Sequence, residues 1–340
     1  MKDQNTPKIS IIIPCRNEEN YIGQCIQSLI DMDHENDSME ILVVDGNSND
    51  QSISIIKEYQ NKYNFVRLIS NPNKFTPHGL NLGINNAKSE FVMIASAHSI
   101  FSKSYLLEIF QALNGLKADA AGGVMITCVK NKSRKTLSIC KVFSNKFGVG
   151  NSMFRVGSEK IIEVDTVPFG IYRKEIFKEV GLYDERLIRN HDIELSKRII
   201  NRNKKIYLVP SANCIYFVRE TFRGIAKNNF SNGLWNILTV YVTKKLSPAS
   251  LRHFVPLLFI LSLIIPLVLM IWFPVLGLIA AFSFIAYLLT SSVVSLKIKD
   301  KSSSFYFIFW AFIVLHFSYG FGSLIGLFRL DYLLKYRSTD

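Results

Sequence analysis

Residues 8–50, KISIIIPCRNEENYIGQCIQSLIDMDHENDSMEILVVDGNSND, decide the fold of this chain. The stretch begins with an apolar, β-branched run at 8–13 and continues with apolar residues at helical spacing over 19–30. A second strand-like run follows at 40–44. A strand, a helix and another strand at this spacing predict a parallel strand pair joined by a right-handed crossover.

The same alternation continues downstream. Strand-like runs recur at 65–69 and 90–95, and helical patterns at 50–62 and 79–87 separate the strands. We therefore expect an α/β domain with a mostly parallel sheet, in which ligands bind beyond the carboxyl ends of the strands. Polar residues follow the four predicted strands at 14–18, 45–50, 71–74 and 96–99.

A later block, at about 163–210, completes the predicted domain. It contains a strand candidate, a helix at 174–180, an acidic segment at 190–194 that opens a helix, and a strand at 205–209. Apolar residues at helical spacing then run beside Arg223, Lys227 and Lys244. This pattern over 221–246 predicts an amphipathic helix on a membrane surface, with a helix packed on the domain core as the alternative.

Two long stretches lack Asp, Glu, Lys and Arg, at 254–296 and 305–328. A bilayer-spanning helix needs about 20 apolar residues. The first stretch is long enough for two spans with a turn near Pro274 and Gly277, and the second is long enough for one. The alternative is a very apolar soluble core. We expect the first two segments to be better candidates for membrane spans than the third.

Basic residues predict the orientation of these spans. Lys244, Lys245 and Arg252 precede the first stretch, and three lysines at 297, 299 and 301 precede the second. Both clusters favour the cytoplasmic side. The basic tail after 328 disagrees with the same rule if the third segment spans, so a re-entrant or interfacial segment is an alternative. The N-terminal MKDQNTPKIS has no apolar run typical of a secretory signal.

Composition narrows the class of partner. The formal net charge is +13, but no recognition helix, zinc finger or RNA-binding signature accompanies it, so we expect no nucleic acid. A positive face against anionic lipid headgroups fits better. The five cysteines (Cys15, Cys25, Cys128, Cys140, Cys214) lack close paired spacing, which argues against a disulfide framework and a zinc site.

Six segments in order resemble one known family. They are IIIPCRNEENYIGQCIQSL, ILVVDGNSNDQS, NPNKFTPHGLNLGINNA, SAHS, FGIYRKEIF and LIRNHDIELSKRI. The order resembles the inverting family 2 glycosyltransferases with a GT-A fold, over about residues 8–255. Within that family the chain is most similar to bacterial membrane-associated enzymes that extend lipid-linked exopolysaccharide or succinoglycan-type units.

The resemblance implies a nucleotide-sugar donor at the strand ends. Asp45 could accept the uracil N3 hydrogen, and the loop after the first strand could hold the nucleoside, although each residue alone also suits an ordinary turn or helix cap. The cations Arg16 and Lys74 and the amide of Asn81 could face the diphosphate. The expected donor-binding residues are Pro14, Arg16, Asn17, Glu18, Asp45, Lys74, Asn81 and Ser96.

The fourth strand end departs from the family. Family members usually have Asp, any residue, then Asp or His, which lets Mg²⁺ or Mn²⁺ bridge the protein and the donor. Here the residues are Ser96, Ala97 and His98. Because these ions prefer hard oxygen ligands, we expect a weakened metal site at His98, with Ser96 contacting the donor directly or through water.

The catalytic base is expected in the acidic segment. Asp192 matches the family's catalytic aspartate, which would deprotonate the acceptor hydroxyl during inverting transfer. His191 replaces the usual Glu and either tunes the base or packs. Glu194 is the alternative base, or it complements the helix dipole. Gly170 would let the backbone approach the acceptor, or it is a plain turn glycine.

Processive relatives carry a Gln, two residues, Arg, Trp motif downstream. This chain has Arg219, Arg223 and the looser KNNFSNGLW at 227–235, which favours the addition of one sugar per encounter. We expect a catalytic domain at 1–215, an interfacial linker at 216–252, a membrane region of two to three helices at 253–330, and a tail at 331–340.

The predicted function is transfer of one sugar, from a UDP-sugar or a similar donor, to a lipid-linked glycan acceptor in cell-surface polysaccharide synthesis. The catalytic domain would lie at the cytoplasmic face of the inner or plasma membrane, together with other assembly proteins. Two alternatives are a polyprenyl-phosphate glycosyl synthase and a catalytically silent scaffold. A nicotinamide-dependent dehydrogenase is disfavoured because no G-x-G-x-x-G follows the first strand.

Overall fold

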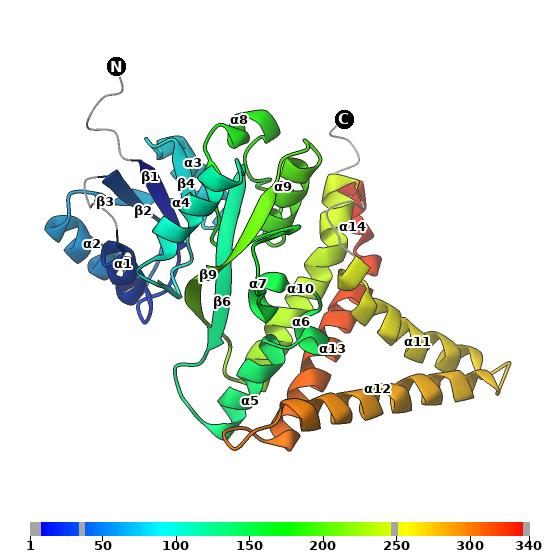
Figure 1. Ribbon diagram of the computed structural model, residues 1–340. Helices are drawn as coiled ribbons and strands as arrows, with labels where there is room; N and C mark the ends of the chain where they lie inside the picture. The colour runs from blue at the N-terminus through cyan, green and yellow to red at the C-terminus, as the bar shows by residue number, and fades with distance from the viewer. Residues whose placement is uncertain (1–7, 34–37, 246–250, 336–340) are drawn as a thin grey trace. The chain divides into compact units, whose positions relative to one another are not determined.

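The computed structural model describes residues 8–33, 38–245 and 251–335 (Figure 1). The chain divides into two compact units. Unit 1 comprises Met1–Ile126 and Met153–Phe217, and unit 2 comprises Thr127–Ser152 and Val218–Asp340. The predicted boundary near 215 lies close to the third point at which the chain passes between the units, after Phe217, but the sequence did not predict that 127–152 belongs to unit 2. The expectations about residues 1–7, 246–250 and 336–340 lie outside the described residues.

The first half of unit 1 is the parallel sheet that the sequence predicted. Its strands pair in the order β3-β2-β1-β4, and all three pairings are parallel. Their carboxyl ends therefore share one edge of the sheet. The strands are β1 (Ile9–Cys15), β2 (Met39–Asp45), β3 (Val66–Ser70) and β4 (Phe91–Ile94).

The second half of the sheet is mixed. After β4 the order continues β8-β6-β9-β5, and β7 pairs with β9. β8 runs antiparallel to both β4 and β6, and β5 and β7 run antiparallel to β9. Sequence reasoning missed β5 and β6. These strands are β5 (Ser99–Phe101), β6 (Ala120–Cys128), β7 (Ile162–Glu163), β8 (Ile171–Arg173) and β9 (Ile206–Phe217).

Helices cover both faces of this sheet. Ile11 and Ile13 of β1 pack on one face and Ile12 on the other, as expected for a parallel strand buried on both sides. The first core includes residues of α1 (Ile22–Ile30), α2 (Ser52–Lys62) and α4 (Tyr105–Gly115). The second includes residues of α3 (Thr76–Asn86), α8 (Ile176–Val180) and α9 (His191–Ile200). The short helix α7 (Met153–Val156) also belongs to unit 1.

Unit 2 is helical. It contains α5 (Arg134–Phe143), α6 (Lys146–Val149), α10 (Phe222–Thr243), α11 (Val255–Leu269), α12 (Leu276–Ile298), α13 (Phe305–Phe328) and α14 (Leu330–Lys335). Within the described residues, α12 and α13 are long and apolar enough to cross a membrane. Only 11% of the apolar window of α12 is buried, against 44% for α13. An apolar helix that exposes most of its surface suits a lipid environment.

The structure changes which apolar segments are the better candidates for membrane spans. We expected the first segment to be a firmer span than the third, but α11 has 15 residues and contains Pro266, whereas α13 is a continuous helix of 24 residues. At 1.5 Å per residue, α11 alone is about 22 Å long, which is short of the bilayer core. An unbroken α13 is also not the shape of a re-entrant loop.

The helix predicted over 221–246 is α10, and one face of it packs closely on α13. A Cβ added at Gly233 would lie 2.0 Å from the carbonyl oxygen of Tyr319, and one at Gly322 would lie 2.0 Å from that of Phe230. Small residues that allow such backbone approach are typical of helix pairs in membranes. The predicted linker helix is therefore a packed member of unit 2.

The inserted segment 127–152 is bound to the loop between α12 and α13. Ser138 Oγ accepts a hydrogen bond from the Ser304 backbone N–H at 2.9 Å, and Lys141 pairs with Asp300 at 2.8 Å. Farther along, His316 Nε2 lies 2.8 Å from the Phe147 carbonyl oxygen. A carbonyl only accepts, so Nε2 carries the proton. These contacts explain why the insertion belongs with the apolar helices.

Candidate active site

The loops after β1 and β2 are joined by side chain to backbone hydrogen bonds. The Asn17 backbone N–H donates to Ser48 Oγ, and the Asn49 N–H donates to Asn17 Oδ1, both at 2.9 Å. Asn17 holds a positive φ of 56°, which Asn tolerates better than most residues. The loops that we expected to hold a nucleoside therefore form one structure at the sheet edge.

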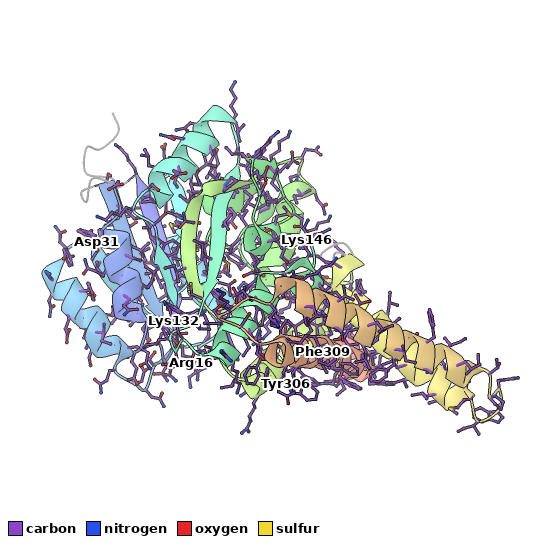
Figure 2. The ribbon with its side chains drawn as sticks, turned by 60° about the horizontal axis from the view of Figure 1, so that its bottom comes forward. Arg16, Asp31, Lys132, Lys146, Tyr306 and Phe309 are labelled. Carbon is purple, nitrogen blue, oxygen red and sulfur yellow. The ribbon has the colours of Figure 1, made fainter. Side chains whose placement is uncertain are left out.

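Asp45 is buried at the end of β2. Its Oδ1 accepts from Ser48 Oγ at 2.5 Å, and its Oδ2 accepts from the Ser48 N–H at 3.0 Å. A carboxylate has about four acceptor positions, so these two bonds leave capacity for a ligand N–H. Pro14 is half-buried in β1, and Arg16 is exposed on the loop that follows (Figure 2).

Lys74 lies beside the same edge. Its carbonyl oxygen would lie 2.8 Å from a Cβ added at Gly46, so the two loops approach too closely for a side chain there. Lys74 adopts a positive φ of 67° and is exposed. Its ammonium is thus available to a ligand, as the prediction requires.

Asn81 is directed elsewhere. Its side chain is buried, its Nδ2 donates to the Tyr183 carbonyl at 2.9 Å and to Glu185 Oε1 at 3.0 Å, and its Oδ1 accepts from the Tyr183 N–H at 2.9 Å. The amide is occupied by the loop that precedes α9. Asn81 therefore positions that loop, and its expected contact with the donor diphosphate stays a prediction.

The end of β4 brings predicted residues from two strands together. His98 Nδ1 lies 3.3 Å from Glu18 Oε1, and Ser96 Oγ lies 3.3 Å from the same nitrogen. Each of the two side chains of the ion pair is about a quarter exposed. The Glu18 carboxylate therefore faces His98, a contact that we did not expect in addition to its predicted role at the nucleoside.

Gly170 lies next to this motif. The Ile94 backbone N–H donates to the Gly170 carbonyl at 3.0 Å, so β8 begins beside the residues that lead to Ser96. A Cβ on Gly170 would meet Val167 at 2.9 Å and the Tyr172 ring at 3.2 Å, which explains the glycine by crowding. The preceding Phe169 has a positive φ of 49°, an unusual conformation that is enriched at functional sites.

The start of α9 distinguishes the two candidate bases. Asp192 is exposed in the first turn, whereas Glu194 is 7% exposed. Both carboxylate oxygens of Glu194 accept from Arg198, each at 2.8 Å. Arg198 also donates to the carbonyls that precede Tyr183. Glu194 is therefore part of a buried ion pair, and Asp192 is the exposed carboxylate of the two.

The surroundings of Asp192 were not identified from the sequence. Tyr172 and Tyr183 are electrostatic neighbours of Asp192, and burial raises the pKa of both phenols. His191 packs edge-on against the Tyr183 ring, and burial lowers the pKa of its imidazole. The lowered pKa disfavours positive charge on His191 beside Asp192. No motif in the sequence marks these tyrosines.

Arg219 and Arg223 are exposed residues of unit 2, before and within the first turn of α10. Their expected contact with an acceptor stays a prediction. The cysteines are all free in the structure.

The described residues contain no group of three or more His, Cys, Asp or Glu side chains that could hold a metal ion. Glu18 and His98 supply one carboxylate and one imidazole, and Ser96 supplies only a hydroxyl. This set fits a weakly held ion that obtains its remaining ligands from the donor, and it does not fit a tightly bound resident metal.

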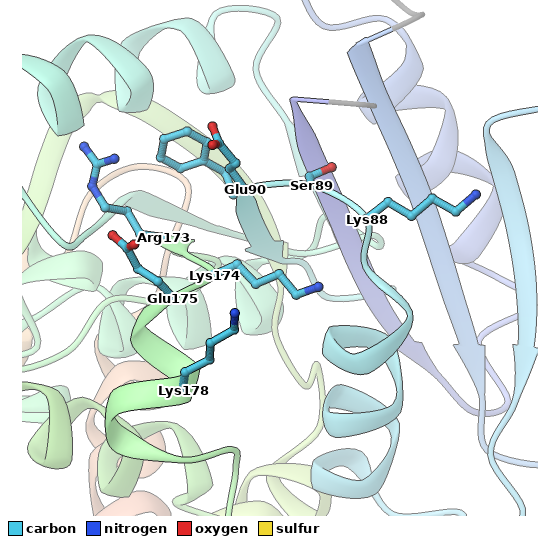
Figure 3. A pocket seen from close by; sticks show the side chains of 8 residues that line it. Lys88, Ser89, Glu90, Arg173, Lys174, Glu175 and Lys178 are labelled. Carbon is cyan, nitrogen blue, oxygen red and sulfur yellow. The ribbon is translucent and has the colours of Figure 1, made fainter. Parts of the chain in front are cut away.

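A separate pocket of about 340 Å³ lies at the opposite end of β4 (Figure 3). It is lined by residues at 88–91, 173–175 and 178. Lys174 Nζ is bound to the Ala87 carbonyl, and Arg173 Nε donates to the Ala118 carbonyl at 3.3 Å. Because ligands of such sheets bind at the carboxyl ends of the strands, this pocket is not part of the site.

Comparisons with known proteins agree with this geometry. The sequence pattern of glycosyl transferase family 2 matches residues 10–181. A Methanococcus voltae protein named dolichyl N-acetyl-alpha-D-glucosaminyl phosphate 3-beta-D-2,3-diacetamido-2,3-dideoxy-beta-D-glucuronosyltransferase is 30% identical over 66% of this chain and 71% of its own. The succinoglycan biosynthesis protein ExoA of Rhizobium meliloti is 24% identical over 62% of this chain and 63% of its own.

Solved structures share the fold. The mannosyltransferase PcManGT from Pyrobaculum calidifontis, in complex with GDP-Man and Mn²⁺, has a TM-score of 0.57 at 16% identity over 94% of this chain and 88% of its own. Residues 1–349 of S. aureus TarS have a TM-score of 0.53 at 17% identity over 93% of this chain and 90% of that chain. At these identities the likeness concerns the fold, which is GT-A.

Proposed function

Since this chain is a glycosyltransferase of family 2, we propose that it moves one sugar from a nucleotide-sugar, with inversion, to a lipid-linked glycan at a membrane. The observation that carries the proposal is the pair of carboxylates at the start of α9. Glu194 is bound to Arg198, and Asp192 is exposed beside the loop that Asn81 positions. Asp192 is thus the exposed carboxylate of the pair, and the proposal makes it the base.

In the proposed reaction Asp192 takes the proton of an acceptor hydroxyl. The hydroxyl oxygen forms a bond to the anomeric carbon from the face opposite the nucleotide. The bond from that carbon to the diphosphate oxygen breaks, and its electron pair leaves with the nucleoside diphosphate. A positioned general base contributes about 10² to 10⁴ in rate.

The joined loops after β1 and β2 are proposed as the nucleoside site. Asp45 keeps acceptor capacity, which suits the N3 hydrogen of uracil and favours a UDP-sugar. Arg16 and Lys74 are exposed cations near the strand ends and suit the diphosphate. Gly170 lies beside the residues that lead to Ser96, and the proposal keeps its backbone as a contact for the acceptor.

A Mg²⁺ or Mn²⁺ ion bound with the donor would have His98 and Glu18 as protein ligands. Such an ion would supply positive charge to the leaving diphosphate. Ser96 stands where the family usually has a carboxylate, so the affinity of this protein for the ion is expected to be low.

The acceptor and the location follow from unit 2. α12 and α13 support attachment to a membrane, and the lysines at 297, 299 and 301 favour the cytoplasmic side for their loop. The names of two relatives refer to a dolichyl-linked acceptor and to succinoglycan biosynthesis. We propose a lipid-linked glycan acceptor at the cytoplasmic face of the inner or plasma membrane, in polysaccharide synthesis together with other assembly proteins.

The test is an assay of purified full-length protein in lipid. A panel of nucleotide-sugars is combined with short lipid-linked glycans, and the released nucleotide and the product are measured. We expect one sugar to be added to a glycan and its anomeric configuration to be inverted. A lipid monophosphosugar as the product would instead identify a polyprenyl-phosphate glycosyl synthase. If the protein neither transfers sugar nor hydrolyses any donor, the result would favour a binding or scaffold protein.

A further inference from the structure

The end of β4 offers a metal ion one carboxylate, that of Glu18. Among the three residues of the motif, only His98 is a strong metal ligand, and within the part of the chain that the structure describes it pairs with one carboxylate, that of Glu18. A departing nucleoside diphosphate carries at least two negative charges, which some cation has to balance. A permanent protein cation near this point would serve that need without a metal.

Arg155 of α7 is such a cation. Its guanidinium carbon lies 5.3 Å from the centre of the Tyr216 ring and 5.7 Å from that of Phe154. Both distances are within the range of cation–π contact. The two rings hold the flat guanidinium in a defined orientation, which suits a residue that recognises phosphate oxygens.

Tyr216 connects Arg155 to the end of β4. The Tyr216 ring also lies 5.0 Å from the His98 ring, measured between centres. His98 in turn contacts Ser96 and Glu18. Arg155 is therefore one aromatic ring away from the residue at which the donor diphosphate is expected.

Burial makes this charge costly. Desolvation lowers the pKa of the Arg155 guanidinium, but arginine stays protonated in proteins at neutral pH. A partly buried positive charge is stabilised when an anion with suitable hydrogen-bond acceptors approaches. The sequence motifs do not include Arg155, because it lies between the segments that resemble the family and is connected to the end of β4 only through Tyr216 of β9.

We propose that Arg155 is a donor-binding residue that donates hydrogen bonds to the diphosphate of the nucleotide-sugar and replaces part of the charge that a metal bound by a carboxylate would supply. The proposal rests on the proposed function. It predicts that nucleoside diphosphate binding needs Arg155 and persists in the presence of a chelator.

The experiment measures binding by calorimetry in detergent, with and without Mn²⁺. The ligands are UDP and GDP, each compared with its nucleoside, which lacks the diphosphate. Arg155→Gln is expected to weaken binding of the diphosphate at least about tenfold, the loss of one charged hydrogen bond, and to leave nucleoside binding unchanged. Arg155→Lys is expected to retain part of the affinity. Arg202→Gln, at an exposed arginine of the same unit, is the matched control.

If Arg155→Gln weakens binding of the diphosphate and of the nucleoside equally, Arg155 only supports the fold. The melting temperature of each variant provides a second check of this outcome. Unchanged affinity for the diphosphate would overturn the proposal. So would loss of diphosphate binding by the wild-type protein when a chelator removes metal. If the wild-type protein binds neither nucleotide under any condition, the proposed function itself fails.

Discussion

The end of β4 and the start of α9, where the resemblance implies acidic motifs of the family, differ in the negative charge that they carry. At β4 a hydroxyl, Ser96, stands in the place of a carboxylate, and His98 pairs with Glu18 from a neighbouring loop. At α9 two carboxylates remain, and the fold separates their roles, because Glu194 is buried with Arg198 while Asp192 is exposed. Loss of the base would stop proton transfer, whereas charge at the diphosphate can be supplied from elsewhere.

The strongest test of this difference is Asp192→Asn. The amide cannot accept the proton, so we expect the rate of transfer to fall by about 10² to 10⁴, with donor affinity nearly unchanged. Single-turnover transfer and calorimetric donor binding measure the two effects. Asp31→Asn, at an exposed aspartate that follows α1 (Figure 2), is the matched control. An active Asp192→Asn protein would remove Asp192 from the mechanism.

Glu194→Gln tests the other carboxylate. It leaves Arg198 partly buried without its charged partner, so we expect the free energy of unfolding of the protein to fall by about 3 kcal/mol. Asp192→Asn should change the same quantity by less than about 0.5 kcal/mol, because that side chain is exposed. Chemical denaturation of both variants in detergent gives the comparison. A stable Glu194→Gln protein that no longer transfers sugar would instead make Glu194 the base.

Ser96→Asp tests the end of β4, and its expected effect is the smallest of the three. The new carboxylate would restore a hard oxygen ligand beside His98 and Glu18. We expect Mn²⁺ to tighten nucleoside diphosphate binding about tenfold more in the variant than in the wild-type protein, which corresponds to about 1.4 kcal/mol. Ser211→Asp, at an exposed serine of β9, controls for the added charge. An equal response of all three proteins to Mn²⁺ would mean that Ser96 does not limit metal binding.

Much of unit 1 was accessible from the sequence because its signals are local. Apolar runs predicted β1 to β4, and polar residues at their ends predicted the site edge. β5 and β6 were missed. β5 has only three residues and is stabilised by pairing with β9, more than a hundred residues away. Short strands of this kind depend on their partners, and their own residues show little periodicity.

Within the site, residue type was predictable and environment was not. Asn81 has the chemistry of a phosphate contact, yet the loop at Tyr183 occupies its amide. Arg155 lies in a segment without a recognisable motif and meets His98 only through Tyr216 of β9. These outcomes depend on which distant segments pack together.

The sequence by itself determined the α/β fold of the catalytic unit, the edge of the sheet at which ligands bind, and the apolar character of the C-terminal helices. Periodicity and hydropathy are properties of neighbouring residues, so they can be read without a structure. Only the tertiary structure showed that Glu194 is buried with Arg198 while Asp192 is exposed, brought Arg155 against the Tyr216 ring, and joined segment 127–152 to the apolar helices. Burial, ion pairing and ring contacts arise between residues far apart in the chain, and their consequences appear only when the chain has folded.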